Sequence, residues 1–352
     1  MYIAVAILAF GLLIAVHELG HFTAAKLLGV RVNEFAIGMG PKILKKQGKE
    51  TLYSLRILPF GGFCAMEGED AQSADARSFG AQKRWRRVVI LAAGAFMNLV
   101  AGFLIVIILT SSATDFAGTT LTDLADWFPN EGENGIMVGD TIVSLNGERL
   151  YYIEDFKTFM SLNKGDTVDL VIKRYGEKIT LRDFPLTPRE YMTDGEPVLR
   201  YGLTFNEIPA TFGQKLKYSC YTTMNYVRLI RVSLAQLFSG AAGIRDLSSP
   251  VGIVSVMNDI GKAAPTFGAA IARIASLTAF IAVNLAVMNM LPIPALDGGR
   301  ILFLFITLAI EKITRRRLNP KYEGYINTAA FVLLMGLMVF TLVNDVVKII
   351  GG

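Results

Sequence analysis

Four long stretches of apolar residues alternate with polar segments along the chain. They cover Met1 to about Val30, about Val88 to Thr110, about Phe267 to Ile310, and about Ile326 to Val343. A transmembrane helix takes about 20 such residues, so each stretch is long enough to cross a bilayer. The third is too long for one straight helix and is interrupted by Pro292, Pro294, Gly298 and Gly299. The pattern therefore predicts a multi-pass α-helical membrane protein with about four transmembrane helices.

The first stretch could instead be a cleaved signal peptide. It has neither a basic segment at its start nor a cleavage site between small residues, which are the marks of a signal peptide. We therefore expect this stretch to be retained as a membrane helix.

Lys and Arg residues indicate the orientation in the membrane. They gather between Arg31 and Arg87 and again between Lys312 and Lys321, and loops rich in them usually stay in the cytoplasm. The long segment after the second stretch has six acidic residues and no basic one from Asp115 to Asp140. This pattern places that segment and both chain termini outside the cytoplasm. The basic loops also suit anionic lipid headgroups, and nothing in the sequence indicates nucleic-acid binding.

Composition agrees with this interpretation and narrows it. Hydrophobic residues make up 52% of the 352 residues and the mean hydropathy is +0.44, which excludes an ordinary soluble protein. Charged residues still reach 18%, so polar loops or a soluble module must also be present. The two cysteines, Cys64 and Cys220, are too few for a disulfide framework or a cysteine-based zinc site.

The chain has two histidines, His17 and His21, and they form an H-E-x-x-H motif in the first apolar stretch. Two imidazoles four residues apart share one helix face and can bind one zinc ion. The sixteen residues before His17 are uncharged, so the zinc would lie inside the bilayer or at its edge. A chance match would make these ordinary helix residues, but polar groups at membrane depth are costly and usually functional. Glu18 is then the general base, which takes a proton from zinc-bound water and gives it to the leaving amine.

A catalytic zinc site needs a third protein ligand besides water. The sequence has no further histidine, and carboxylates within the apolar stretches are few. The third stretch contains Asp297, which follows two prolines and precedes two glycines. By itself Asp297 could be a helix cap or a turn residue. Because the two histidines lack a third ligand, we predict that Asp297 completes the zinc site.

The H-E-x-x-H motif and the N-x-x-P-x-P-x-L-D-G-G pattern from Asn289 to Gly299 together resemble the site-2 protease family of intramembrane zinc metalloproteases. The chain is most similar to the bacterial branch that carries a PDZ domain and works in regulated intramembrane proteolysis. This resemblance covers nearly the whole chain. It implies that Asp297 is the third zinc ligand and that Asn289 and Pro292 lie beside the substrate. Ala95 and Ser249 depart from the family pattern, which usually has Pro and Gly there.

Residues 51–67 alternate in polarity and contain a Pro59-Phe60-Gly61-Gly62 turn, which predicts a β-hairpin. The hairpin resembles the family's membrane-associated β-loop near the active site, although it could be an ordinary cytoplasmic hairpin. A helical substrate must unwind before cleavage, because its peptide bonds are held in internal hydrogen bonds. An exposed strand at Gly61 and Gly62 could hold the unwound segment by β-augmentation.

The segment 117–205 resembles one bacterial PDZ domain (α+β), with a strand before the Asn146-Gly147 turn, a helix over 151–162 and a strand over 167–172. In this branch such a domain more often acts as a size filter than as a peptide binder. Residues 211–238 predict an amphipathic helix, either on the outer membrane surface or as a plain connector. We therefore expect membrane core over 1–116, the PDZ domain over 117–205, a connecting segment over 206–266, and membrane core over 267–352.

The residues and the resemblance together predict an intramembrane zinc endopeptidase of the bacterial cytoplasmic membrane. The family implies single-span membrane substrates, such as anti-sigma factors or remnant signal peptides, that an upstream extracytoplasmic protease has already cut. One alternative is a membrane-anchored zinc protease that acts on soluble or misfolded proteins, although that class usually carries its motif in a hydrophilic domain. The other alternative is a non-catalytic PDZ scaffold, which would have no reason to keep the histidines, Glu18 and Asp297 together.

Overall fold

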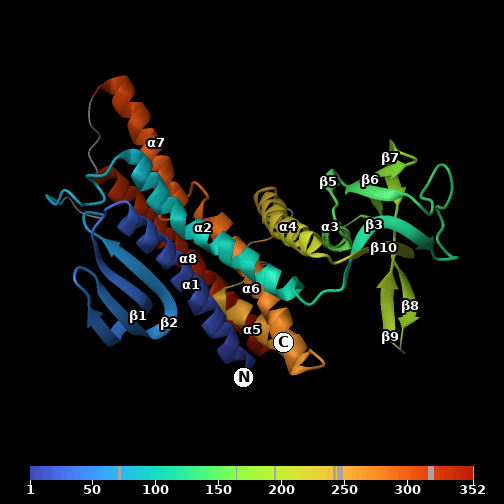
Figure 1. The fold of residues 1–352 in the computed structure, drawn as a ribbon, viewed down its shortest axis with the longest axis horizontal. Coiled ribbons are helices and arrows are strands. Elements are labelled where there is room, and N and C mark those ends of the chain that lie inside the picture. Colours follow the sequence, from blue (N-terminus) through green and yellow to red (C-terminus); the bar gives the residue numbers. More distant parts are fainter. Residues whose placement is uncertain are drawn as a thin grey trace. The chain divides into compact units, whose positions relative to one another are not determined.

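The computed structural model describes residues 1–69, 73–163, 165–193, 196–240, 243, 249–315 and 321–351. The chain forms two compact units (Figure 1): Met1–Leu109 together with Tyr226–Gly352, and the intervening Thr110–Asn225. The second unit therefore extends beyond the predicted 117–205 module at both ends. Residues 316–320 of the predicted basic loop, and Ser248, lie outside the described residues.

Among the described residues, four apolar helices are long enough to cross a membrane, as the sequence predicts. They are α1 (Tyr2–Leu27), α2 (Arg84–Thr110), α6 (Phe267–Asn289) and α8 (Lys321–Gly351). The third apolar stretch is divided at its prolines, because α6 ends at Asn289 and α7 (Asp297–Thr314) begins only after residues 290–296. Proline lacks the backbone N–H that a continuous helix would need there.

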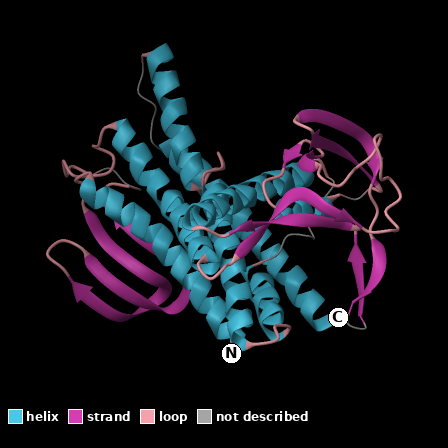
Figure 2. Ribbon diagram, turned by 45° about the vertical axis from the view of Figure 1, so that its right-hand side comes forward, coloured by secondary structure: helices cyan, strands magenta, loops and turns pink. Residues whose placement is uncertain are grey.

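Two further helices precede α6 in the chain, and Figure 2 draws the helices in cyan. α4 (Phe212–Phe238) matches the predicted amphipathic helix, whereas α5 (Pro250–Lys262) is a helix that the apolar pattern does not indicate. The side chain of Ser249 caps α5 by accepting the Gly252 N–H at 3.3 Å, and proline follows at the first helical position. The Ser249 N–H donates to Asp345 Oδ2 of α8 at 2.6 Å, which ties α5 to α8.

A sheet of β1 (Val32–Gln47) and β2 (Leu52–Met66) lies beside α1 (Figure 1). In its register, Glu34–Ile37 of β1 is matched both with Leu52–Leu55 and with Gly62–Ala65 of β2. The predicted pairing within 51–67 is therefore wrong, because the first part of β1 lies between the two halves of that segment. The tight turn lies at residues 48–51 instead, where Gly48 N–H donates to the Thr51 oxygen at 2.9 Å. Gly61, at φ +87°, belongs to a bend within β2.

The second unit is built around a sheet with strand order β10-β3-β4-β6-β7, in which β5 also pairs with β4. The strands are β3 (Asp115–Leu124), β4 (Thr141–Leu145), β5 (Glu148–Arg149), β6 (Thr167–Arg174), β7 (Glu177–Pro185) and β10 (Leu203–Pro209). Asn146 and Gly147 have φ of +47° and +81°, as in the tight turns that join paired strands. α3 (Ile153–Leu162) follows, and β8 (Arg189–Thr193) pairs separately with β9 (Glu196–Arg200). The predicted order of strand, turn, helix and strand is present, while the PDZ assignment stays a prediction.

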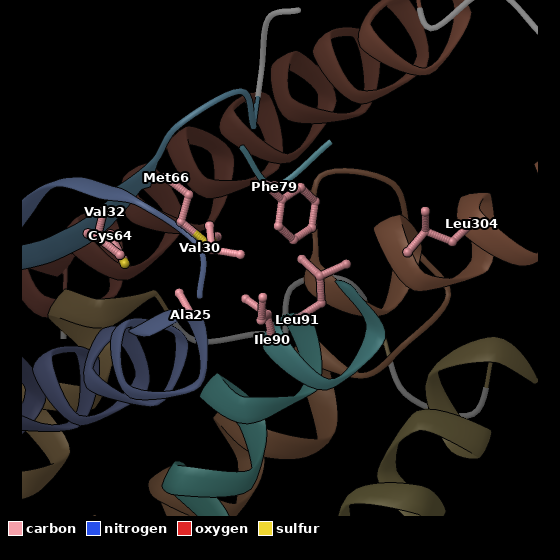
Figure 3. Close-up of a cluster of buried hydrophobic side chains, with 9 residues drawn as sticks. All are labelled: Ala25, Val30, Val32, Cys64, Met66, Phe79, Ile90, Leu91 and Leu304. Carbon is pink, nitrogen blue, oxygen red and sulfur yellow. The ribbon is translucent and has the colours of Figure 1, made fainter. Parts of the chain in front are cut away.

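A cluster of buried apolar side chains joins the elements around the histidine motif (Figure 3). It contains Ala25 of α1, Val30, Val32 of β1, Cys64 and Met66 of β2, Phe79, Ile90 and Leu91 of α2, and Leu304 of α7. Ile90 is fully buried, and burying a side chain of this size contributes about 1.5–3 kcal/mol. The cluster therefore fixes α1, β2, α2 and α7 against one another.

Candidate metal centre

The two histidines of α1 and Asp297 of α7 turn their ligand atoms toward one another. His17 Nε2 lies 3.2 Å from His21 Nε2 and 3.2 Å from Asp297 Oδ2, and His21 Nε2 lies 3.3 Å from the same oxygen. All three side chains are buried or half-buried. The ligand atoms of the three predicted zinc ligands thus form one triangle, although His17 and Asp297 are 280 positions apart in the sequence.

The triangle has the dimensions of a zinc site. Zinc binds nitrogen and oxygen ligands tetrahedrally at about 2.0–2.1 Å, which separates the ligand atoms by about 3.3 Å. Asp297 Oδ2 is buried and makes no hydrogen bond of good geometry to any described residue. A buried carboxylate oxygen that faces two imidazole nitrogens needs a cation to balance its charge. The residues therefore fit a metal ion, and two imidazoles with one carboxylate are a donor set that suits zinc.

Helix α2 fixes the tautomer of His21. Nδ1 of His21 lies 2.8 Å from the backbone oxygen of Ile90, which can only accept a hydrogen bond, so Nδ1 carries the proton and donates it. The unprotonated Nε2 then faces the other two ligands. Such a hydrogen bond orients the ring of most metal-binding histidines.

Asn98 of α2 has the corresponding place beside His17. Its amide Nδ2 lies 3.5 Å from His17 Nδ1, and its buried Oδ1 has no hydrogen-bond partner among the described residues. A half-turn of the amide group exchanges the two atoms. Oδ1 then accepts the proton of His17 Nδ1 and gains its missing partner, and His17 Nε2 is left for the metal.

Two glycines allow α1 and α2 to approach closely at this point. A Cβ added at Gly94 would lie 2.4 Å from His21 Nε2 and 2.7 Å from His17 Cε1. A Cβ at Gly20 would lie 2.3 Å from the Ala93 oxygen. Glycine is therefore required in the histidine motif and opposite it, because any side chain would push the helices or the imidazole rings apart.

The break between α6 and α7 brings Asp297 to the histidines. Asp297 is the first residue of α7, where the positive end of the helix dipole favours a carboxylate. A Cβ at Gly298 would lie 2.4 Å, and one at Gly299 2.1 Å, from backbone oxygens of the break, so the break lies flat on the start of α7. Ala295 within it has φ +72°, in the left-handed region that costs a non-glycine residue about 1–2 kcal/mol.

A cavity of 470 Å³ surrounds the three ligands. Its lining includes Glu18, Asn289 and the end of β2, namely Phe63, Cys64, Ala65 and Met66. Burial raises the pKa of the Cys64 thiol to about 12, which keeps it protonated beside the site. The predicted general base thus lies between the ligand triangle and β2.

The remaining predicted residues lie at different distances from this cavity. Gly62 is adjacent to the predicted base, because a Cβ there would lie 3.3 Å from Glu18 Cγ. Gly61 lies against the side chain of Met39 instead. Pro292 is exposed in the break, while Asn289 lines the cavity at the end of α6.

An ion pair that the sequence analysis does not identify also lines the cavity. Arg300 Nη1 donates to Glu69 Oε1 at 2.5 Å, and the Met66 N–H donates to Glu69 Oε2 at 3.3 Å. The pair connects the end of β2 with the first turn of α7, directly after Asp297. The available signal is the charge itself, because Arg300 lies inside an apolar stretch and follows the paired glycines.

Known proteases match nearly the whole chain. The model of peptidase family M50 matches residues 5–337. A protein of Clostridium perfringens that is named as a zinc metalloprotease is 40% identical over 348 residues, covering 99% of each chain. One of Clostridium acetobutylicum is 39% identical over 345 residues, 98% of this chain and 97% of that one. The regulator of sigma-W protease RasP of Bacillus subtilis is 27% identical over 432 residues, covering 97% of each chain.

These matches confirm the family that the motifs predict and the zinc that the family uses. Together with the four apolar helices, they identify an integral membrane protein. The chain therefore belongs to peptidase family M50, the site-2 protease family, and is a zinc metalloprotease.

Proposed function

We propose that this protein hydrolyses peptide bonds within transmembrane segments, using a zinc ion held by His17, His21 and Asp297. The observation that carries the proposal is the position of the ligands. Both histidines belong to α1, an apolar helix long enough to cross a membrane, and their ligand atoms lie within 3.3 Å of Asp297. A soluble substrate would have to enter the bilayer to reach such a site, whereas a transmembrane segment is already there.

Glu18 carries the proton transfers. The zinc ion supplies Lewis acidity, which polarises a carbonyl group and lowers the pKa of water to about 7. Glu18 lines the ligand cavity and takes the proton of the attacking water, then donates it to the leaving amine. This division of roles makes Glu18 essential for hydrolysis but not for zinc binding.

β2 presents the substrate. A transmembrane helix hides its peptide bonds, so the cleaved segment must be extended before Glu18 can act on it. We assign this task to the strand that begins at Gly61 and Gly62, because it passes Glu18 and pairs with β1 along one edge. The substrate adds to its other edge by β-augmentation. Asn289 at the cavity wall and Pro292 in the break lie on the substrate's opposite side.

The substrates are single-span membrane proteins that an extracytoplasmic protease has already shortened. Support comes from the Bacillus subtilis relative, whose name describes it as a regulator of sigma-W protease. Membrane-bound inhibitors of sigma factors fit this class, as do remnant signal peptides. The second unit, placed outside the cytoplasmic membrane and acting as a PDZ-type size filter, excludes substrates that are still too large.

Cleavage of a single-span reporter by the purified protein tests the proposal. Glu18→Gln should retain zinc and lose cleavage, and Asp297→Asn should lose both. Asp259→Asn is the matched control, because Asp259 is an exposed carboxylate on α5. We expect cuts within the span that disappear with a chelator and return with added zinc. Cuts confined to soluble peptides or loop sequences would refute the proposal in favour of a membrane-anchored protease.

A further inference from the structure

Asn327 on α8 is a polar side chain within a candidate membrane span, Gly324–Val347. It is half-buried, while its neighbours Ile326 and Thr328 are exposed. A polar residue in such a helix faces protein and has a partner, because lipid offers none. The partner is the backbone of the α6–α7 break, where the Ala295 N–H donates to Asn327 Oδ1 at 3.3 Å.

The backbone N–H groups of residues 291–296 show why this contact matters. Pro292 and Pro294 have no N–H. Leu291 donates to the Met288 oxygen at 3.1 Å, Ile293 to Leu291 at 2.8 Å, and Leu296 to Ile293 at 3.2 Å. These three bonds are local to the break and its preceding helix. Ala295 instead donates to a side chain of a distant helix.

Ala295 is also the strained residue of the break. Its φ of +72° is unfavourable for alanine, so the surrounding structure must hold it there. Its hydrogen bond to Asn327 holds it from outside the break. Asp297 follows two residues later and is separated from Ala295 only by the N-cap residue of α7. Release of the Ala295 peptide would therefore shift the carboxylate that faces the histidines.

We infer that Asn327 is a positioning residue for the metal centre, which couples α8 to the third ligand through the Ala295 peptide. The inference rests on the proposed function in one respect, since it takes Asp297 to be a zinc ligand. It adds a requirement that the ligand set alone does not contain. Asp297 holds zinc tightly only while an acceptor on α8 keeps the strained peptide in place.

Zinc affinity of the purified full-length protein, measured by competition with a chelator of known affinity, tests this inference. Asn327→Leu has nearly the same shape but no acceptor, and it should weaken zinc binding about 10- to 100-fold, as loss of an outer-shell partner does. Asn327→Asp keeps the acceptor and should stay near wild type. Thr328→Ala is the matched control, because the Thr328 hydroxyl donates to Gly324 of its own helix at 2.8 Å.

A second substitution separates positioning from general stability. Glycine adopts positive φ without strain, so Ala295→Gly in the Asn327→Leu background should recover part of the lost zinc affinity.

The outcomes distinguish this inference from the ligand assignment. Wild-type zinc affinity in Asn327→Leu, or equal losses in the Leu and Asp variants, would overturn the role of Asn327. Lowered thermal stability with unchanged zinc affinity of the folded protein would also overturn it. Asp297→Asn is measured in parallel: if that variant binds zinc like wild type, the ligand set itself is wrong.

Discussion

Replacing Gly94 with alanine should disable the proposed metal centre, because a single methyl group would occupy the space of the two imidazole rings that we propose as zinc ligands. The added Cβ would lie 2.4 Å from His21 Nε2, 2.8 Å from His21 Cε1 and 2.7 Å from His17 Cε1. Ordinary contact begins near 3.4 Å, so the rings or α2 must move by about 1 Å. Zinc–ligand distances tolerate only about 0.2 Å. A displacement of about 1 Å at a reacting centre typically costs about 100-fold in rate.

Zinc content and reporter cleavage of purified Gly94→Ala measure this effect, with thermal unfolding recorded on the same samples. Gly102→Ala is a matched control on the same helix. Its Cβ would lie 2.8 Å from Val283 Cγ2 and 3.0 Å from the Ala279 oxygen, away from the ligands. We expect Gly102→Ala to lower stability while keeping its zinc, and Gly94→Ala to lose zinc and activity. Stoichiometric zinc and wild-type cleavage in Gly94→Ala, or equal zinc loss in both variants, would refute the reasoning.

Three further predictions concern residues around the site. Glu69→Gln and Arg300→Met, alone and combined in a double-mutant cycle, should reveal a coupling of about 1 kcal/mol in unfolding free energy; a coupling of zero would contradict the ion pair. Burial opposes ionisation of Glu34, but hydrogen bonds from a serine, an arginine and a lysine outweigh it and hold its pKa at about 2 instead of 4.5. The ionised carboxylate therefore stabilises the sheet above about pH 4.5, and this stabilisation is lost as the pH falls toward 2. In Glu34→Gln, the stability measured by resistance to proteolysis should therefore depend less on pH across that range. Asp345→Ala leaves the Ser249 N–H without the acceptor that lies 2.6 Å away. It should lower the unfolding free energy by about 1–3 kcal/mol and leave the zinc content unchanged. Loss of zinc would contradict a purely structural role.

The membrane helices and the ligand triangle are predictable from the sequence for the same physical reason. Lipid excludes polar groups, so apolar length reveals a helix, and each polar residue within it stands out. His17, His21 and Asp297 stand out in this way, and the structure brings them within 3.3 Å of one another. Spacing alone places the histidines on one helix face. The position of Asp297 required an argument by elimination, because nothing local connects it to α1.

The β1–β2 sheet shows where such reasoning fails. Alternation and the proline–glycine turn correctly indicate strand structure over 51–67, but they carry no information about the partner. Glu34–Ile37 inserts between the halves of that segment, and this pairing depends on contacts with residues much earlier in the chain. Gly38, at φ +85°, allows β1 to bend, so that Glu34–Ile37 can pair with β2 along both of its edges. A glycine-rich stretch of this kind resembles a loop in sequence, which is why the pattern leaves β1 unpredicted.

Polar residues in apolar helices mark supports of the site as well as its ligands, and sequence alone does not distinguish the two. Asn98, Asn327 and Asp345 all lie in candidate spans. Asn98 lies beside the ring of His17, Asn327 accepts the N–H of a strained peptide, and Asp345 accepts the N–H that begins α5. Each interaction joins helices that are distant in sequence, so the partner is visible only in the fold. The cost of a polar group in lipid explains why these residues are exceptional, and the geometry of the break is the basis of the zinc-positioning role inferred for Asn327.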